Sequence, residues 1–103
     1  MADEYENLIM TDEFLDSLRR LVPSPTRDDI TGLLAALDDL DSHPTRLDHG
    51  TRLHLLDREL TGSWSLTPLE PADQRLRVLV RPERTALGRG VWRIGPVTWH
   101  YRR

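Results

Sequence analysis

Near its C-terminal end the chain alternates apolar and basic residues in an order that suits a β-strand and little else. The alternating residues are Arg75, Arg77 and Arg81 on one side and Leu76, Val78 and Val80 on the other. Side chains two positions apart point to the same side of a strand. Residues 74–80 are therefore predicted to form a strand that buries its apolar side and turns its arginines away from the core.

A helix is predicted to begin soon after the N-terminus. Thr11 offers a side-chain oxygen as an N-cap, and the acidic Asp12 and Glu13 suit the positive end of a helix dipole. Apolar residues at helical spacing extend this helix over residues 12–22. Pro23 then ends it, because proline lacks a backbone donor.

A second helix is predicted over residues 27–40. Thr26 and Asp29 have the spacing of a capping box, and leucines recur behind them at helical spacing. The short connection between the two helices predicts a tight helical hairpin.

The rest of the chain is predicted to be strands and connections. The other predicted strands lie at residues 5–10 and 63–69, and one final strand covers residues 91–94 and 97–101, so that the predicted meander has three strands. Gly95 and Pro96 interrupt the last strand, which predicts a bulge or bend there. Residues 45–62 and 82–90 are predicted to be connections, the first with room for one short strand or turn.

These elements predict a single α+β domain over residues 1–103. In it, the N-terminal strand and the helical hairpin pack on an antiparallel β-meander, with both helices on one face. The predicted core is Phe14, Leu15, Leu18, Ile30, Leu33, Leu34, Leu37, Trp64, Leu66, Leu76, Val78, Val80, Ile94 and Val97.

The composition excludes several kinds of chemistry. All 14 basic residues are arginine and cysteine is absent, so a lysine base, a cysteine nucleophile and thiolate metal sites are ruled out. The four histidines are scattered, and no metal or other cofactor is expected. No apolar run approaches the roughly 20 residues of a membrane span, and an acidic N-terminus does not suit a signal peptide, so a cytoplasmic protein is expected.

Charge is divided unevenly along the chain. The first 73 residues hold 6 arginines and 16 acidic residues, whereas the last 30 hold 8 arginines and one acidic residue. A basic end of this kind suits contact with phosphates, or else the arginines pair internally with the acidic helices. Arg75, Arg77 and Arg81 follow each other at two and four residues, and each two residues of a strand span about 7 Å, close to the phosphate repeat of a nucleic-acid strand.

The aromatic residues near the C-terminus have two interpretations. Trp99 and Tyr101 share a strand face and are placed to stack on bases, with His100 on the other side. Alternatively, Trp92 and Trp99 belong to the core.

Together, these patterns resemble the RelE/ParE toxin superfamily of bacterial toxin-antitoxin systems. The resemblance covers nearly the whole chain and rests on the order of the elements and on the segments Leu40–Pro44, Leu60–Leu66, Arg75–Arg81 and Arg93–Tyr101. It implies a RelE-like endoribonuclease that cleaves mRNA on the ribosome, blocks translation and is neutralised by a cognate antitoxin.

The resemblance also implies roles for individual residues. Arg77 and Arg81 would stabilise the negative charge of the transition state, and His100 or Tyr101 would orient or move the proton. The RNA-binding residues it implies are Arg75, Arg93, Trp99, Arg102 and Arg103.

A second hypothesis is a non-catalytic or degenerate module on the same fold, acting on a protein partner. Relatives commonly carry a His-Arg pair after Ile-Gly, but here Pro96 and Val97 follow Ile94 and Gly95. They also commonly carry lysines, which this chain lacks. A third hypothesis is a plain nucleic-acid binder whose RNA affinity falls steeply with salt.

Overall fold

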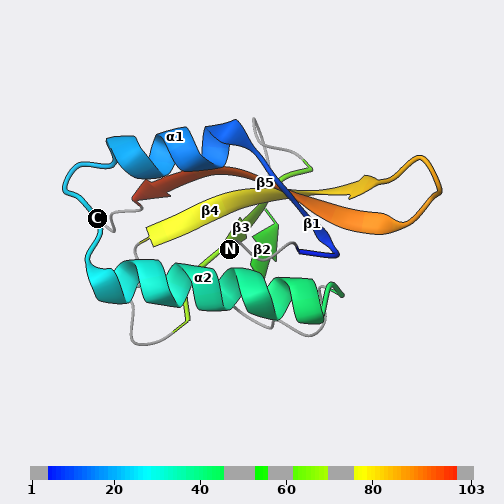
Figure 1. The fold of residues 1–103 in the computed structure, drawn as a ribbon, viewed down its shortest axis with the longest axis horizontal. Coiled ribbons are helices and arrows are strands. Elements are labelled where there is room, and N and C mark those ends of the chain that lie inside the picture. The colour runs from blue at the N-terminus through cyan, green and yellow to red at the C-terminus, as the bar shows by residue number, and fades with distance from the viewer. Residues whose placement is uncertain (1–4, 46–52, 56–61, 70–75, 100–103) are drawn as a thin grey trace.

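The computed structural model describes residues 5–45, 53–55, 62–69 and 76–99. In chain order these form β1 (Leu8–Met10), α1 (Asp12–Arg20), α2 (Arg27–Ser42), β2 (Leu53–Leu55), β3 (Trp64–Leu66), β4 (Leu76–Arg84) and β5 (Gly90–Trp99) (Figure 1). Within these segments, neither helix is long and apolar enough to cross a membrane.

The described strands form one mixed sheet in the order β1-β5-β4-β3-β2. Strands β2 to β5 pair antiparallel with their chain neighbours, as a meander does. Strand β1 pairs parallel with β5, with Leu8 opposite Trp92, so the N-terminal strand forms one edge of the sheet. The predicted α+β class is confirmed, and the meander has one strand more than the three expected because β2 pairs with β3.

Helix α1 lies along the edge of β5, just beyond the end of β1. Its N-cap is Thr11, as predicted; the Thr11 hydroxyl accepts from the backbone N–H of Phe14 and donates to the carbonyl oxygen of Ile94, at 2.6 Å. Farther along the helix, the Ser17 hydroxyl accepts from the backbone N–H of Val97 at 2.7 Å. These contacts satisfy β5 groups that a neighbouring strand would otherwise bind. The prediction of both helices on one face is therefore wrong for α1, which lies at an edge.

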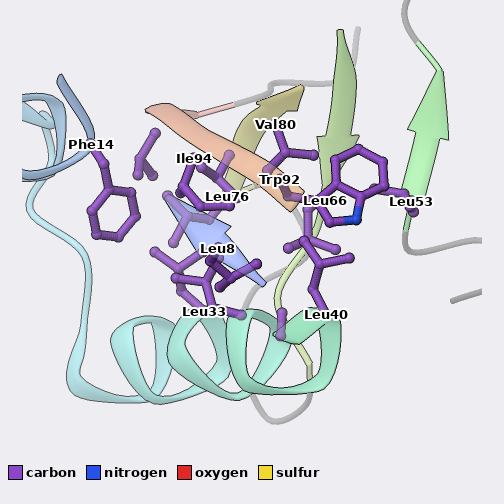
Figure 2. Close-up of a cluster of buried hydrophobic side chains, with 14 residues drawn as sticks. Leu8, Phe14, Leu33, Leu40, Leu53, Leu66, Leu76, Val80, Trp92 and Ile94 are labelled. Atoms are coloured by element: carbon purple, nitrogen blue, oxygen red, sulfur yellow. The ribbon is translucent and has the colours of Figure 1, made fainter. Parts of the chain in front are cut away.

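Helix α2 covers one face of the sheet, and the core lies between them. The capping box is present, with Thr26 and Asp29 each accepting a backbone N–H from the other. Figure 2 shows Leu33 and Leu40 pointing from α2 toward the strand side chains, while Phe14 enters from α1. The buried apolar residues include Leu8, Phe14, Leu33, Ala36, Leu37, Leu40, Leu53, Leu66, Leu76, Val78, Val80, Trp92, Ile94 and Val97.

Two predicted core residues are exposed. Leu15 of α1 and Leu34 of α2 are 47% and 45% exposed. Each lies on a helix that contacts the rest of the described protein on one side, and apolar residues outside that contact stay at the surface.

The last two strands differ from their predicted bounds. Strand β4 continues past Val80 to Arg84, and it tolerates Pro82 because β3 pairs only with residues 78–80 of β4 and leaves the edge beyond unpaired. Strand β5 continues through Gly95 and Pro96. The turn between β4 and β5 is therefore short.

A bulge in β5 confirms the irregularity predicted at Gly95 and Pro96. Val78 pairs with Val97, and Val80 pairs with Ile94, so β5 advances three residues while β4 advances two. The extra residue keeps Ile94 and Val97 on the same side of the sheet, where both are buried. Strict alternation without the bulge would have turned one of them away from the core.

Candidate functional site

The side chains of β4 and β5 that point away from α2 form what we call the arginine face. Its residues include Arg77, Leu79, Arg81 and Glu83 of β4 and Arg93 and Thr98 of β5. Leu76, Val78 and Val80 of β4 are fully buried on the opposite, core face. The predicted separation of arginines from the core along β4 is thus present for Arg77 and Arg81.

Arg81 is exposed, and a serine holds its side chain in place. Its Nε donates to the hydroxyl oxygen of Ser63 at 2.9 Å, and Ser63 is itself 3% exposed. This bond uses one guanidinium donor and leaves the terminal nitrogens for an anionic ligand. Among the described residues, no carboxylate forms an ion pair with Arg81.

Arg93 faces Arg81 across the β4–β5 ladder but is already neutralised. It forms an ion pair with Glu83 of β4, through both Nε and Nη2. The hydrogen bond and charge of Glu83 raise the pKa of Arg93, and the hydrogen bond from Arg93 holds the pKa of Glu83 below its ordinary value. Arg93 is therefore less available to a phosphate than Arg81.

Arg77 differs from both Arg81 and Arg93 in its burial. It is partly buried, and its Nε is buried with no hydrogen-bond partner. Burial lowers the pKa of Arg77, because removal from water disfavours the charged form. The strand rise puts Arg77 and Arg81 roughly 13 Å apart along β4, so they suit two phosphates about two nucleotides apart better than a single phosphate.

A hollow of about 330 Å³ opens beside Arg81. Its polar lining is Glu13, Ser63, Arg81 and Arg93, and its remaining lining is Leu79, Gly95 and Pro96. Arg77 lies outside this lining. A wider hollow of about 610 Å³ near Trp92 has Glu83 and Arg84 as its charged lining, and Arg84 donates to the carbonyl oxygen of Gly88.

Sequence analysis did not identify Glu13 as a site residue. It was assigned to the N-terminal turn of a helix, where acidic residues are common. Its place in the hollow depends on α1 lying along the β5 edge, which no local pattern indicated. The predicted bulge at Gly95 was the one sequence feature that pointed to this part of the sheet, because bulges often lie beside functional sites.

The tryptophans belong to the core face. Trp92 is 4% exposed, and its ring meets that of Trp64 edge to face with centroids 6.2 Å apart. Trp99 is partly buried, lies opposite Leu76 and donates through Nε1 to the carbonyl oxygen of Pro23. Trp99 therefore lies on the side of the sheet away from Arg81, and the structure does not bring it to the arginine face as a stacking residue.

Several predicted site residues lie outside the described part of the chain. They are Arg75, His100, Tyr101, Arg102 and Arg103. Their predicted roles in RNA binding and proton transfer stay predictions. Within the described segments, no group of three or more histidine, aspartate or glutamate residues is placed to hold a metal ion.

Comparisons with known proteins gave no relative. No protein-family model matches the chain, and no curated protein or solved structure matches it.

Proposed function

We propose that the arginine face binds single-stranded RNA and that the protein is a RelE-like toxin that cleaves mRNA on the ribosome. The observation that carries the proposal is Arg81, an exposed guanidinium held by Ser63, unpaired with any described carboxylate and bordering a hollow. A pre-oriented guanidinium of this kind suits a phosphate, which it binds through parallel hydrogen bonds.

The proposed catalytic role of Arg81 follows from its charge. Attack of a ribose 2′-hydroxyl on the adjacent phosphate gathers negative charge on the phosphate oxygens. A donor positioned beforehand stabilises that charge more than it stabilises the ground state. Because a guanidinium stays protonated near neutral pH, Arg81 stabilises charge and does not accept the hydroxyl proton.

Arg77 extends the proposed RNA path along β4. Its separation from Arg81 corresponds to about two nucleotides of an extended strand. The resemblance to RelE-like toxins adds the ribosome, a cytoplasmic location and a cognate antitoxin as proposed context. The proposal also keeps the predicted role of His100 or Tyr101 in orienting or moving the proton.

The decisive test is replacement of Arg81 by alanine. We expect R81A to bind a fluorescein-labelled single-stranded oligoribonucleotide about 10-fold to 100-fold more weakly, measured by fluorescence polarisation, because a charge-assisted bond is lost. The slope of log affinity against log salt concentration should fall by about one. In a bacterial host, R81A should permit growth and leave transcripts intact.

The matched control is R84A, on the same strand. Arg84 is exposed and outside the Arg81 hollow, so R84A makes the same charge change at a different place. Equal losses of RNA affinity in R81A and R84A would mean that binding depends only on the net charge of the protein. Full toxicity of a folded R81A protein, checked by circular dichroism, would exclude the proposed mechanism.

A non-catalytic module acting on a protein partner is the second candidate. It is favoured by the state of the other arginines on the face, because Arg93 is paired with Glu83 and Arg77 is partly buried. Induced expression that arrests growth while transcripts stay intact would support this candidate over the nuclease.

A further inference from the structure

We propose that Glu13 is the general base of the RNA-cleavage reaction, an inference that rests on the proposed nuclease function. The reaction needs a group that takes the proton from the attacking 2′-hydroxyl. Of the described side chains that line the hollow beside Arg81, Glu13 carries the only carboxylate. Arginine cannot take up this proton, and a serine hydroxyl is too weak a base.

Two hydrogen bonds, made by residues before and after Glu13 in the chain, hold the start of α1 against β5. Thr11, two residues before Glu13, donates to the carbonyl oxygen of Ile94, and Ser17, four residues after it, accepts from the N–H of Val97. These bonds lie on either side of the β5 bulge. The first turn of α1 is thereby held against the part of β5 that borders the hollow.

Gly95 lies beside the Glu13 carboxylate. A Cβ at this position would lie 3.6 Å from Oε1 of Glu13 and 3.2 Å from the carbonyl oxygen of Leu79. The bulge therefore has backbone, and no side chain, directly beside the Glu13 carboxylate. A ligand entering the hollow meets the carboxylate without an intervening side chain at position 95.

The two arginines that line the hollow with Glu13 are bound to other groups. Arg81 and Arg93 line the same hollow, yet within the described residues neither forms an ion pair with Glu13, since Arg93 is bound to Glu83 and Arg81 to Ser63. A direct Arg81–Glu13 pair would neutralise both groups. Their separation instead provides a cation for the phosphate and a base for the hydroxyl.

In the proposed step, the 2′-oxygen forms a bond to phosphorus and the bond from phosphorus to the 5′-oxygen breaks. The 2′-hydroxyl proton passes to the Glu13 carboxylate, and the leaving 5′-oxygen takes a proton from a water molecule. The hydroxide so formed takes the proton back from Glu13, which regenerates the base with no net proton consumed. The products are a 2′,3′-cyclic phosphate and a 5′-hydroxyl end. No metal, oxidant or other co-reactant is required.

The test separates binding from chemistry with the variant E13Q. Cleavage is followed by primer extension on purified bacterial ribosomes stalled on a reporter mRNA. Binding is followed separately with a labelled 2′-O-methyl oligoribonucleotide, which lacks the attacking hydroxyl. We expect E13Q to cleave at least about 100-fold more slowly, as loss of a general base does, and to bind the uncleavable RNA as tightly as the unmodified protein or more tightly, since a negative charge is removed.

D12N is the matched control. Asp12 is an exposed acid in the same helical turn but does not line the hollow. We expect D12N to cleave normally. In E13A, added formate should restore part of the cleavage by acting as a carboxylate base, an effect that a purely structural role of Glu13 would not produce.

The outcomes distinguish this inference from the proposed function. Normal cleavage by E13Q would overturn the role of Glu13 and leave the nuclease intact, as would a loss of cleavage matched by an equal loss of binding. No formate effect on E13A would also count against a general base. An unmodified protein that leaves the reporter mRNA uncut would overturn both the nuclease and its base.

Discussion

Strands β4 and β5 present very different side chains on the two faces of the sheet. On the core face, β4 and β5 contribute side chains that are almost completely buried against α2, and their stabilising effect comes from removing apolar surface from water. On the arginine face and beside it, buried polar atoms lack partners at Nε of Arg77 in β4 and at Oγ of Ser65, which lies opposite Leu79 on the neighbouring strand β3. The comparison indicates that one face is organised for stability and that the other carries polar groups that stability alone does not explain.

The largest expected effect tests the core face with two adjacent leucines of α2. Leu33 is fully buried and Leu34 is 45% exposed. We expect L33A to lower the free energy of unfolding by about 2–5 kcal/mol, because it leaves a cavity. L34A should cost less than about 1 kcal/mol, since its side chain contributes less burial. Urea denaturation measures both, and equal costs would mean that α2 packs on the sheet through a different side.

An intermediate effect, on RNA affinity, is expected when Arg93 is released from its ion pair with Glu83. Replacing Glu83 by glutamine removes its ion pair and a negative charge near the proposed RNA path. We expect E83Q to bind the labelled oligoribonucleotide several-fold more tightly at neutral pH. D28N, an exposed acid on α2, makes the same charge change away from this face and should have little effect on binding.

Acid should erase the difference between E83Q and the unmodified protein. Because the pKa of Glu83 is lowered by Arg93, the pair is intact at neutral pH, and its contribution to stability is lost as the pH falls through that lowered pKa. Below it, Glu83 is neutral and Arg93 is free in both proteins. An affinity ratio between them that does not change with pH would contradict this account of the pair.

The smallest expected effect tests the buried Ser65 hydroxyl of β3, next to the arginine face. Ser65 is 1% exposed, and its hydroxyl has no hydrogen-bond partner. We expect S65A to change the free energy of unfolding by less than about 1 kcal/mol, or to increase it, because it removes a buried unpaired group. T26A, which removes the N-cap of α2, should cost about 1 kcal/mol in the same assay. A larger loss in S65A than in T26A would show that the Ser65 hydroxyl stabilises the fold.

Local patterns predicted much of the fold because the forces behind them are local. Helix N-caps at Thr11 and Thr26 depend on side-chain oxygens within three residues of the N–H groups that they bind. The alternation along β4 separated Arg77 and Arg81 from the core because strand geometry alone sends neighbouring side chains to opposite sides. The bulge at Gly95 was predicted because glycine and proline interrupt a regular strand.

The candidate site was less predictable because it depends on contacts between segments that are distant in sequence. Glu13 reaches the hollow only because α1 lies along β5, and the pairing of Arg93 with Glu83 depends on the register of two strands. The direction of Trp99 likewise follows from the extra residue in β5. Neither composition nor periodicity contains these distances.

For this protein, then, the sequence by itself determined where most of the helices and strands lie, where the helices begin, and which side of β4 is apolar, since each depends on neighbours along the chain. Only the tertiary structure decided which arginine is free, which is neutralised and which carboxylate stands beside them. Those properties depend on distances between charges, and the packing of α1, β4 and β5 sets these distances.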